Sequence, residues 1–271
     1  MEAPPVRVPI EGGVLEATVT GSGDPVVLVQ TALVADELLP LAERLRRRFR
    51  VVHHHRRGYA GSSPALQPGS VARDATDCAR LLSAFAVDRV HVVGASYSAA
   101  VALQLAVDHP GVVRTLTLVE PPPVHGPADA AFRAANAALL ADGRALGAEA
   151  AVDRFLVSLM GPDWREQLDG ALPVSSAQVL RDSRTFLDVD IPALLAWPFD
   201  AATAARIRCP VLHVAGSDHG PLFDGVADLV RAWLPDADQV TIPGAGHDVA
   251  LTHPDALGEA VVPFLARHPL G

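Results

Sequence analysis

Lysine is absent from the sequence, because all 22 basic residues among the 271 are arginines. A lysine Schiff base and a lysine general base are therefore impossible, which excludes pyridoxal enzymes and Schiff-base aldolases. Cysteine is nearly absent as well. Cys78 lies in a helical pattern and Cys209 heads an apolar strand, and neither has a Cys or His neighbour at metal-ligand spacing. We interpret both as small buried hydrophobic residues.

Long hydrophobic runs are also missing, and no run of like charge is longer than Arg46 to Arg48. No segment approaches the roughly 18 uninterrupted apolar residues of a membrane span, and residues 1–13 contain no apolar stretch of signal-peptide length. The 31 acidic residues outnumber the basic ones and give a formal net charge of −9, which disfavours binding to a phosphate backbone. We expect a cytoplasmic protein with no nucleic-acid or membrane partner, either a monomer or a homodimer.

The apolar pattern indicates a sheet built from strands that alternate with helices. Two short alternating runs, at residues 6–10 and 14–20, flank Gly12-Gly13 and predict a β-hairpin. Continuous apolar strands alternating with amphipathic helices then predict a parallel sheet covered on both faces. The predicted strands of this sheet are residues 26–29, 49–53, 89–94, 113–120, 209–216 and 239–244. The fold class is therefore α/β, with a mostly parallel eight-stranded sheet.

The alternation stops at Pro121-Pro122-Pro123, and residues 121–205 are Ala-rich and helical in pattern. We interpret this segment as a helical cap inserted into a core made of residues 1–120 and 206–271. The segment holds six of the 13 aromatic residues, namely Phe132, Phe155, Trp164, Phe186, Trp197 and Phe199. This composition favours an apolar cover over a binding site, in which Trp164 and Trp197 line the substrate pocket. The alternative is an ordinary helical subdomain with its own core.

Ser96 lies where a predicted apolar strand runs directly into a helix, which is the position of a nucleophile elbow. Residues two positions to either side must be small in such a turn, as Gly94 and Ser98 are. The usual pattern is G-x-S-x-G, and here serine replaces the second glycine. We predict that Ser96 is a nucleophile; the alternative is a helix N-cap serine.

A serine nucleophile needs a base, and His247 is the best placed of the 11 histidines. It follows the last predicted strand on a Gly-rich loop. A carboxylate must orient this base, and Asp218, just past the strand at residues 209–216, gives the chain order Ser, Asp, His. Glu120, at the end of the strand that follows the nucleophile helix, is the alternative acid. We rank Asp218 above Glu120.

Two backbone N–H groups are needed to stabilise the tetrahedral oxyanion. One is that of Tyr97, at the start of the nucleophile helix, and the other comes from the loop after the strand at residues 26–29, from Ala32 or Leu33. We expect Gln30, Thr31 and Leu33 to line the substrate pocket, with the Gln30 amide free to bind substrate or water.

His53, His54 and His55 form a run that invites a metal-site interpretation. Consecutive strand residues point to opposite faces, so the three side chains cannot converge on one ion. We therefore expect no metal site, and the predicted chemistry needs no cofactor.

These motifs together resemble the α/β-hydrolase superfamily over about residues 14–268. HRRGYAGSS at residues 55–63 is similar to the family's Asp-x-x-Gly-x-Gly-x-Ser loop, with His55 and Ala60 replacing Asp and Gly. Gln30-Thr31 stands where many members have His-Gly. The resemblance implies a serine esterase with a catalytic triad, an oxyanion hole and a cap domain. A serine at the elbow argues against dehalogenases and epoxide hydrolases, whose elbow residue is Asp.

The expected reaction is hydrolysis of an ester, thioester or lactone of a hydrophobic small molecule through an acyl-enzyme. Two alternatives remain open at this point. One is a non-hydrolytic, cyclising or carbon–carbon bond-cleaving enzyme of a biosynthetic pathway that uses the same triad. The other is a ligand-binding protein that has lost turnover, since one fold hosts many functions.

Overall fold

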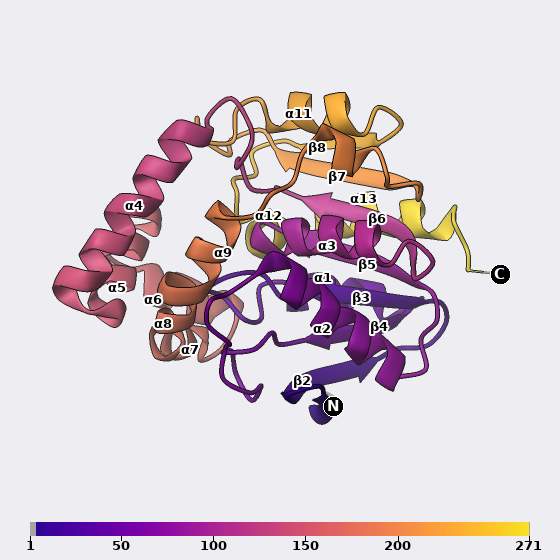
Figure 1. The fold of residues 1–271 in the computed structure, drawn as a ribbon, viewed down its shortest axis with the longest axis horizontal. Coiled ribbons are helices and arrows are strands. Elements are labelled where there is room, and N and C mark those ends of the chain that lie inside the picture. Colours follow the sequence, from indigo (N-terminus) through magenta and orange to yellow (C-terminus); the bar gives the residue numbers. More distant parts are fainter. Residues whose placement is uncertain (1–3, 271) are drawn as a thin grey trace.

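The computed structural model describes residues 4–270 and contains one eight-stranded sheet with strand order β1-β2-β4-β3-β5-β6-β7-β8 (Figure 1). The strands are β1 Val6–Ile10, β2 Gly13–Thr20, β3 Pro25–Val29, β4 Arg50–His54, β5 Val90–Ala95, β6 Val113–Val119, β7 Val211–Gly216 and β8 Asp238–Ile242. The β1–β2 and β2–β4 pairs are antiparallel, and all the others are parallel. The predicted α/β class and the mostly parallel eight-stranded sheet are confirmed.

Helices cover both faces of this sheet, because each strand of the centre is apolar on both sides. One hydrophobic core contains side chains of the helices that follow β4, β5 and β7, and a second core on the other face contains those of the helices that follow β3 and β8. The helices outside the cap segment are α1 Leu39–Leu45, α2 Val71–Ala84, α3 Tyr97–Asp108, α11 Val226–Trp233, α12 Val249–Thr252 and α13 Pro254–Ala266. Helix α1 has Pro40 in its first turn, where a residue without an N–H to donate is well tolerated.

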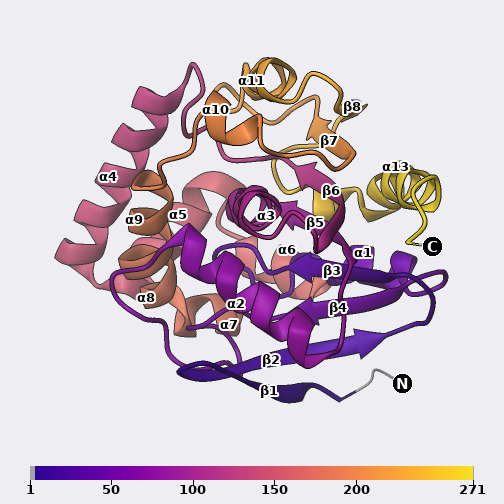
Figure 2. The same cartoon turned by 45° about the vertical axis from the view of Figure 1, so that its right-hand side comes forward.

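Between β6 and β7 the chain is helical, and we call residues 121–205 the cap segment. Its helices are α4 Asp129–Leu146, α5 Ala148–Met160, α6 Trp164–Ala171, α7 Ser175–Arg181, α8 Ser183–Thr185, the π-helical turn η1 Phe186–Asp190, α9 Ile191–Leu195 and α10 Ala201–Ala204. Figure 2 shows α4, α5, α8 and α9 grouped beside one end of the sheet. A third hydrophobic core lies among these helices and includes Leu33, from the loop after β3. That contact ties the cap segment to the sheet.

Within residues 4–270, no helix has the length and apolar character needed to cross a bilayer.

Candidate active site

Ser96 lies in the turn between β5 and α3 with φ 49° and ψ −121°. A positive φ is unfavourable for a residue with a Cβ, so the surrounding structure must hold it in place. A Cβ added to Gly94 would lie 2.2 Å from the backbone oxygen of Ser98, which leaves room only for glycine. The strained turn expected around Ser96 is therefore present.

Ser98 replaces the second glycine of the usual elbow pattern, and its hydroxyl is fully engaged. Its Oγ donates to the Ala95 carbonyl oxygen at 2.9 Å and accepts from the Ala95 N–H at 2.9 Å. The hydroxymethyl group thus bonds back to the last residue of β5, so the turn accommodates it in place of glycine.

His247 follows β8 and brings its ring to the elbow. Its Nε2 lies 3.0 Å from Ser96 Oγ, which is hydrogen-bond distance for a general base. The Phe223 ring stacks on the imidazole with 4.1 Å between the ring centroids. The two residues meet because β5 and β8 are parallel and their carboxyl ends lie at the same edge of the sheet.

Glu120 is the carboxylate beside this histidine. Its Oε2 lies 3.5 Å from His247 Nδ1, and its side chain is only 2% exposed. The other oxygen, Oε1, accepts from the Gly216 N–H at 2.5 Å and lies 3.1 Å from His219 Nδ1. Burial opposes ionisation of this carboxyl. The hydrogen bonds from His247 and Gly216 outweigh burial, so the pKa of Glu120 lies below its usual value.

Asp218, which the sequence pattern places above Glu120 as the acid, is exposed, and among residues 4–270 its carboxylate forms no hydrogen bond or ion pair with His247. Its N–H donates to the Ala245 carbonyl at 2.9 Å, and its carboxylate accepts from Ser217 Oγ at 2.8 Å. The ranking of Asp218 above Glu120 is therefore reversed by the structure. The pairing of β5 with β6 explains why Glu120 is the neighbour of His247. The Ser96 N–H donates to the Val119 carbonyl oxygen, so residue 120 lies next to the elbow.

The loop after β3 supplies the second candidate oxyanion donor. The Leu33 N–H donates to Tyr59 Oη at 3.0 Å and is already engaged. Within the part of the chain that the structure describes, the N–H groups of Ala32 and Tyr97 donate to no protein acceptor. Of the two loop residues considered, Ala32 therefore keeps its amide available.

Gln30 and Thr31 hold this loop and do not offer free groups to a substrate. The buried Gln30 side chain accepts from the Arg56 N–H at 2.7 Å and donates to the Thr31 carbonyl at 2.5 Å. Thr31 Oγ1 donates to the Ala95 carbonyl at 2.9 Å. The expectation of a free Gln30 amide is wrong, because Arg56 occupies its acceptor oxygen.

A buried charge network that the sequence pattern does not predict is centred on Arg56 and includes Asp190 and Asp74. The Arg56 guanidinium donates to both carboxylate oxygens of Asp190 in the cap segment, at 2.9 and 2.7 Å, and to Asp74 at 2.8 Å. It also lies 4.3 Å from the ring centroid of Tyr97. Burial disfavours the charge, but Asp190 and Asp74 outweigh it and hold the pKa of Arg56 well above its usual value. In the sequence, Arg56 is distinguished only by its place in the HRRG motif at residues 55–58.

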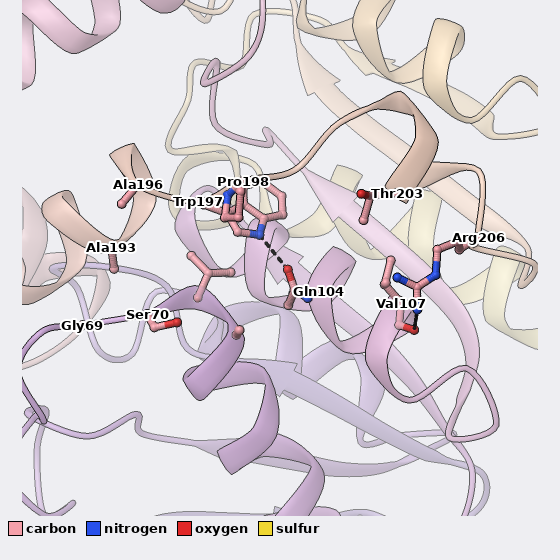
Figure 3. A pocket seen from close by; sticks show the side chains of 12 residues that line it. Gly69, Ser70, Gln104, Val107, Ala193, Ala196, Trp197, Pro198, Thr203 and Arg206 are labelled. Carbon is pink, nitrogen blue, oxygen red and sulfur yellow. Dashed lines mark hydrogen bonds between the residues drawn. The ribbon is translucent and has the colours of Figure 1, made fainter.

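Both tryptophans predicted to line the substrate pocket are buried. Trp164 is fully buried in the core of the cap segment, where its Nε1 donates to Asp153 at 2.9 Å. Trp197 donates from Nε1 to Gln104 at 2.8 Å and lines a pocket of about 200 Å³ with α2, α3 and α10 residues (Figure 3). Neither Ser96 nor His247 lines that pocket.

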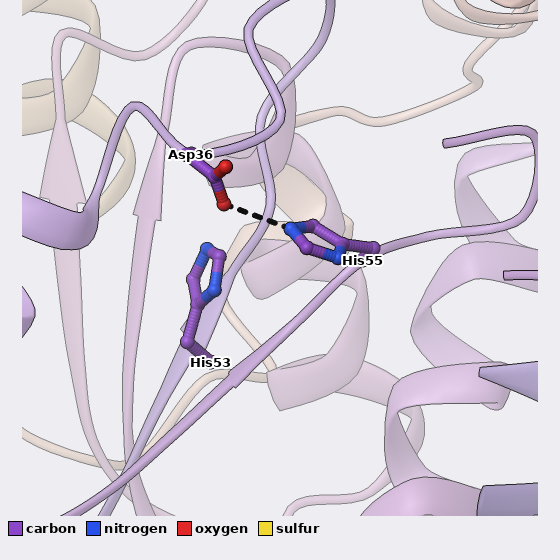
Figure 4. A group of neighbouring side chains, drawn as sticks. All are labelled: Asp36, His53 and His55. Atoms are coloured by element: carbon purple, nitrogen blue, oxygen red, sulfur yellow. Dashed lines mark hydrogen bonds and ion pairs between the residues drawn. The ribbon is translucent and has the colours of Figure 1, made fainter. Parts of the chain in front are cut away.

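The three consecutive histidines do not all point to the same side of β4. His53 and His55 lie on the same side and face Asp36 (Figure 4), and one potential ligand atom from each of these three residues lies within 4.8 Å of the others. The alternation argument against a metal site therefore holds for His54 but not for His53 and His55.

Comparisons with known proteins agree on the architecture. The model of the alpha/beta hydrolase family matches residues 26–260. A protein of Caulobacter sp. (strain K31) named "Putative carbamate hydrolase RutD" is 30% identical over 230 residues, which are 84% of each chain.

Solved structures give the same picture. The enol-lactonase of Burkholderia xenovorans LB400 superimposes with a TM-score of 0.81 at 19% identity, covering 96% of this chain and 100% of that one. An alpha/beta hydrolase of Sphaerobacter thermophilus DSM 20745 is 28% identical with a TM-score of 0.73, covering 96% and 99%.

Proposed function

Because the chain belongs to the alpha/beta hydrolase family and is a hydrolase, we propose that it cleaves an ester, thioester or lactone through an acyl-enzyme on Ser96. The contact of 3.0 Å between His247 Nε2 and Ser96 Oγ is the observation that carries this proposal. A serine hydroxyl becomes a nucleophile when a base at this distance takes its proton.

In the proposed first step, His247 accepts the Ser96 proton while Oγ attacks the acyl carbon. Glu120 stabilises the imidazolium that forms, and it is held for that task by Gly216. The N–H groups of Ala32 and Tyr97 are the proposed donors to the oxyanion. The imidazolium then protonates the leaving alcohol or thiol.

In the second step, His247 removes a proton from water, and the resulting hydroxide attacks the acyl carbon of the Ser96 ester. The tetrahedral intermediate collapses, releases the acid and returns the proton to Ser96. We propose an apolar acyl or alcohol group, since Phe223 stacks on His247 and Leu33 follows the proposed donor Ala32.

A carbamate is the second candidate substrate, and the named relative of Caulobacter sp. (strain K31) favours it. A carbamate carbonyl is attacked in the same way, and its ester oxygen leaves in the same way. Values of kcat/KM for an aryl ester and the matching aryl carbamate, followed by release of the phenol, distinguish the two.

The proposal is tested by labelling with a fluorophosphonate, which reacts with activated serines. We expect one label per chain on the peptide that contains Ser96, and none in Ser96→Ala. Ser98→Gly is the matched control in the same turn and is expected to label normally. Equal labelling of Ser96→Ala and the wild type would contradict the proposal.

A further inference from the structure

A cluster of two histidines and two carboxylates lies at the carboxyl end of β4, apart from Ser96, His247 and Glu120. His53 belongs to β4, His55 follows it directly, and Asp36 comes from the loop before α1. Figure 4 shows both imidazole rings turned toward the Asp36 carboxylate. We propose that Asp36, His53 and His55 bind a divalent transition-metal ion such as Zn²⁺, with Glu16 orienting His55.

The His53 side chain has a buried ring nitrogen without a hydrogen-bond partner. The residue is 3% exposed, and its Nε2 has no hydrogen-bond partner within residues 4–270. A buried polar atom without a partner is costly, and such atoms in native proteins call for an explanation. A ring nitrogen without a hydrogen-bond partner can offer its lone pair to an ion.

His55 is already held in the orientation of a metal ligand. Its Nδ1 lies 3.0 Å from Glu16 Oε1, and its Nε2 lies 2.9 Å from Asp36 Oδ1. Metal-bound histidines almost always donate their second ring N–H to a carboxylate or carbonyl, which is the role that Glu16 fills here. An ion bound between His55 Nε2 and Asp36 takes the place of the proton there, and that proton is released to water.

The types of ligand atom in this cluster indicate which class of metal ion it would bind. Two imidazole nitrogens and one carboxylate oxygen suit Zn²⁺, Co²⁺ or Ni²⁺, whereas Mg²⁺ and Ca²⁺ prefer oxygen ligands alone. Three protein ligands leave a fourth position for water. The Asp36 side chain is 35% exposed, so an ion can enter from solvent on that side.

Binding at this cluster joins three parts of the chain. Glu16 is on β2, the histidines are at the end of β4, and Asp36 lies four residues after Ala32 in the loop between β3 and α1. An ion that binds only the folded protein stabilises it by mass action. We therefore expect Zn²⁺ to raise the Tm of the metal-free protein.

The test is a Co²⁺ titration of the metal-stripped full-length chain, followed by visible absorption. The wild type is expected to bind one Co²⁺ per chain with a band that Zn²⁺ abolishes. His53→Gln is expected to weaken Co²⁺ binding by at least about tenfold. His54→Gln is the matched control, because His54 is equally buried on the same strand but is not part of the cluster, and it should bind as tightly as the wild type.

Asp36→Asn provides a second variant, because it alters the exposed end of the cluster and keeps the side-chain volume. It should fold and show no Zn²⁺-induced rise above its own metal-free Tm. Absence of a Co²⁺ band in the wild type would overturn the proposal. So would Co²⁺ binding of unchanged strength in Asp36→Asn, whether or not His53→Gln folds.

Discussion

The backbone N–H of Gly216 donates to Glu120 Oε1 at 2.5 Å, so the end of β7 holds the carboxylate that follows β6. The second oxygen of Glu120 is thereby left facing His247 Nδ1. A Cβ on Gly216 would lie 2.1 Å from the Ala245 carbonyl oxygen, which explains why the donor in this position is a glycine. Two neighbouring strands therefore fix the tautomer and the orientation of the candidate base.

Glu120→Gln is expected to lower kcat by at least about a hundredfold, because a neutral amide cannot stabilise the imidazolium and favours the wrong tautomer. Asp218→Asn is the matched control, since Asp218 is exposed and its carboxylate forms no hydrogen bond or ion pair with His247 in the described part of the chain. Steady-state kinetics with an aryl ester would measure both variants. A larger loss in Asp218→Asn would return the acid role to that residue.

Gly94→Ala is expected to lower kcat/KM by at least about a hundredfold, because the added methyl group pushes on the Ser98 backbone and displaces the Ser96 hydroxyl. Gly111→Ala is the control, because a Cβ there meets no atom within 4 Å. Activity and thermal melting of both variants would be compared. Wild-type activity in Gly94→Ala would show that the turn is less confined than the distances indicate.

Asp190→Ala is expected to lower the free energy of unfolding by about 3–5 kcal/mol, because it leaves the buried Arg56 guanidinium with one carboxylate fewer. It also removes the acceptor of the Tyr59 hydroxyl, which donates to Asp190 at 2.6 Å. Asp188→Ala, an exposed change in the same π-helical turn, should leave stability close to that of the wild type. Urea unfolding measures both. Equal stability of the two variants would mean that water compensates Arg56 fully.

Glu37 gives a pH-dependent prediction. Burial, and next the negative charge of Asp248, raise the pKa of Glu37 from 4.5 to about 8 in the folded chain. Between these values the folded state keeps a proton that the unfolded state has lost, so this residue makes the free energy of unfolding fall as pH rises. Glu37→Gln lacks that contribution. Its stability relative to the wild type should therefore increase between pH 5 and pH 8 in urea titrations, and a constant difference would contradict the assignment.

The sheet and the elbow could be predicted from the sequence because their signals are local. An apolar strand running into a helix at Ser96, with small residues around it, needs no knowledge of distant contacts. His247 was predictable for the same reason, since it follows the last strand on a Gly-rich loop.

The identity of the acid was not predictable from chain order. It depends on the register between β5 and β6 and on the turn that points Asp218 outward. The conformation of the loop after β3 depends on two hydrogen bonds between residues 26 positions apart in sequence: the Arg56 backbone N–H donates to the Gln30 side chain, and the Tyr59 hydroxyl accepts from the Leu33 N–H. Aromatic composition alone could not separate Trp164, which fills the core of the cap segment, from a residue lining a substrate site.

The most direct test of the central claim is kcat/KM for a hydrolysed aryl ester in Ser96→Ala. Ser96 bears the only hydroxyl bonded to His247 within residues 4–270. We predict a loss of at least about a thousandfold with an unchanged unfolding midpoint. Near-wild-type turnover in this variant would contradict the assignment of Ser96 as the nucleophile.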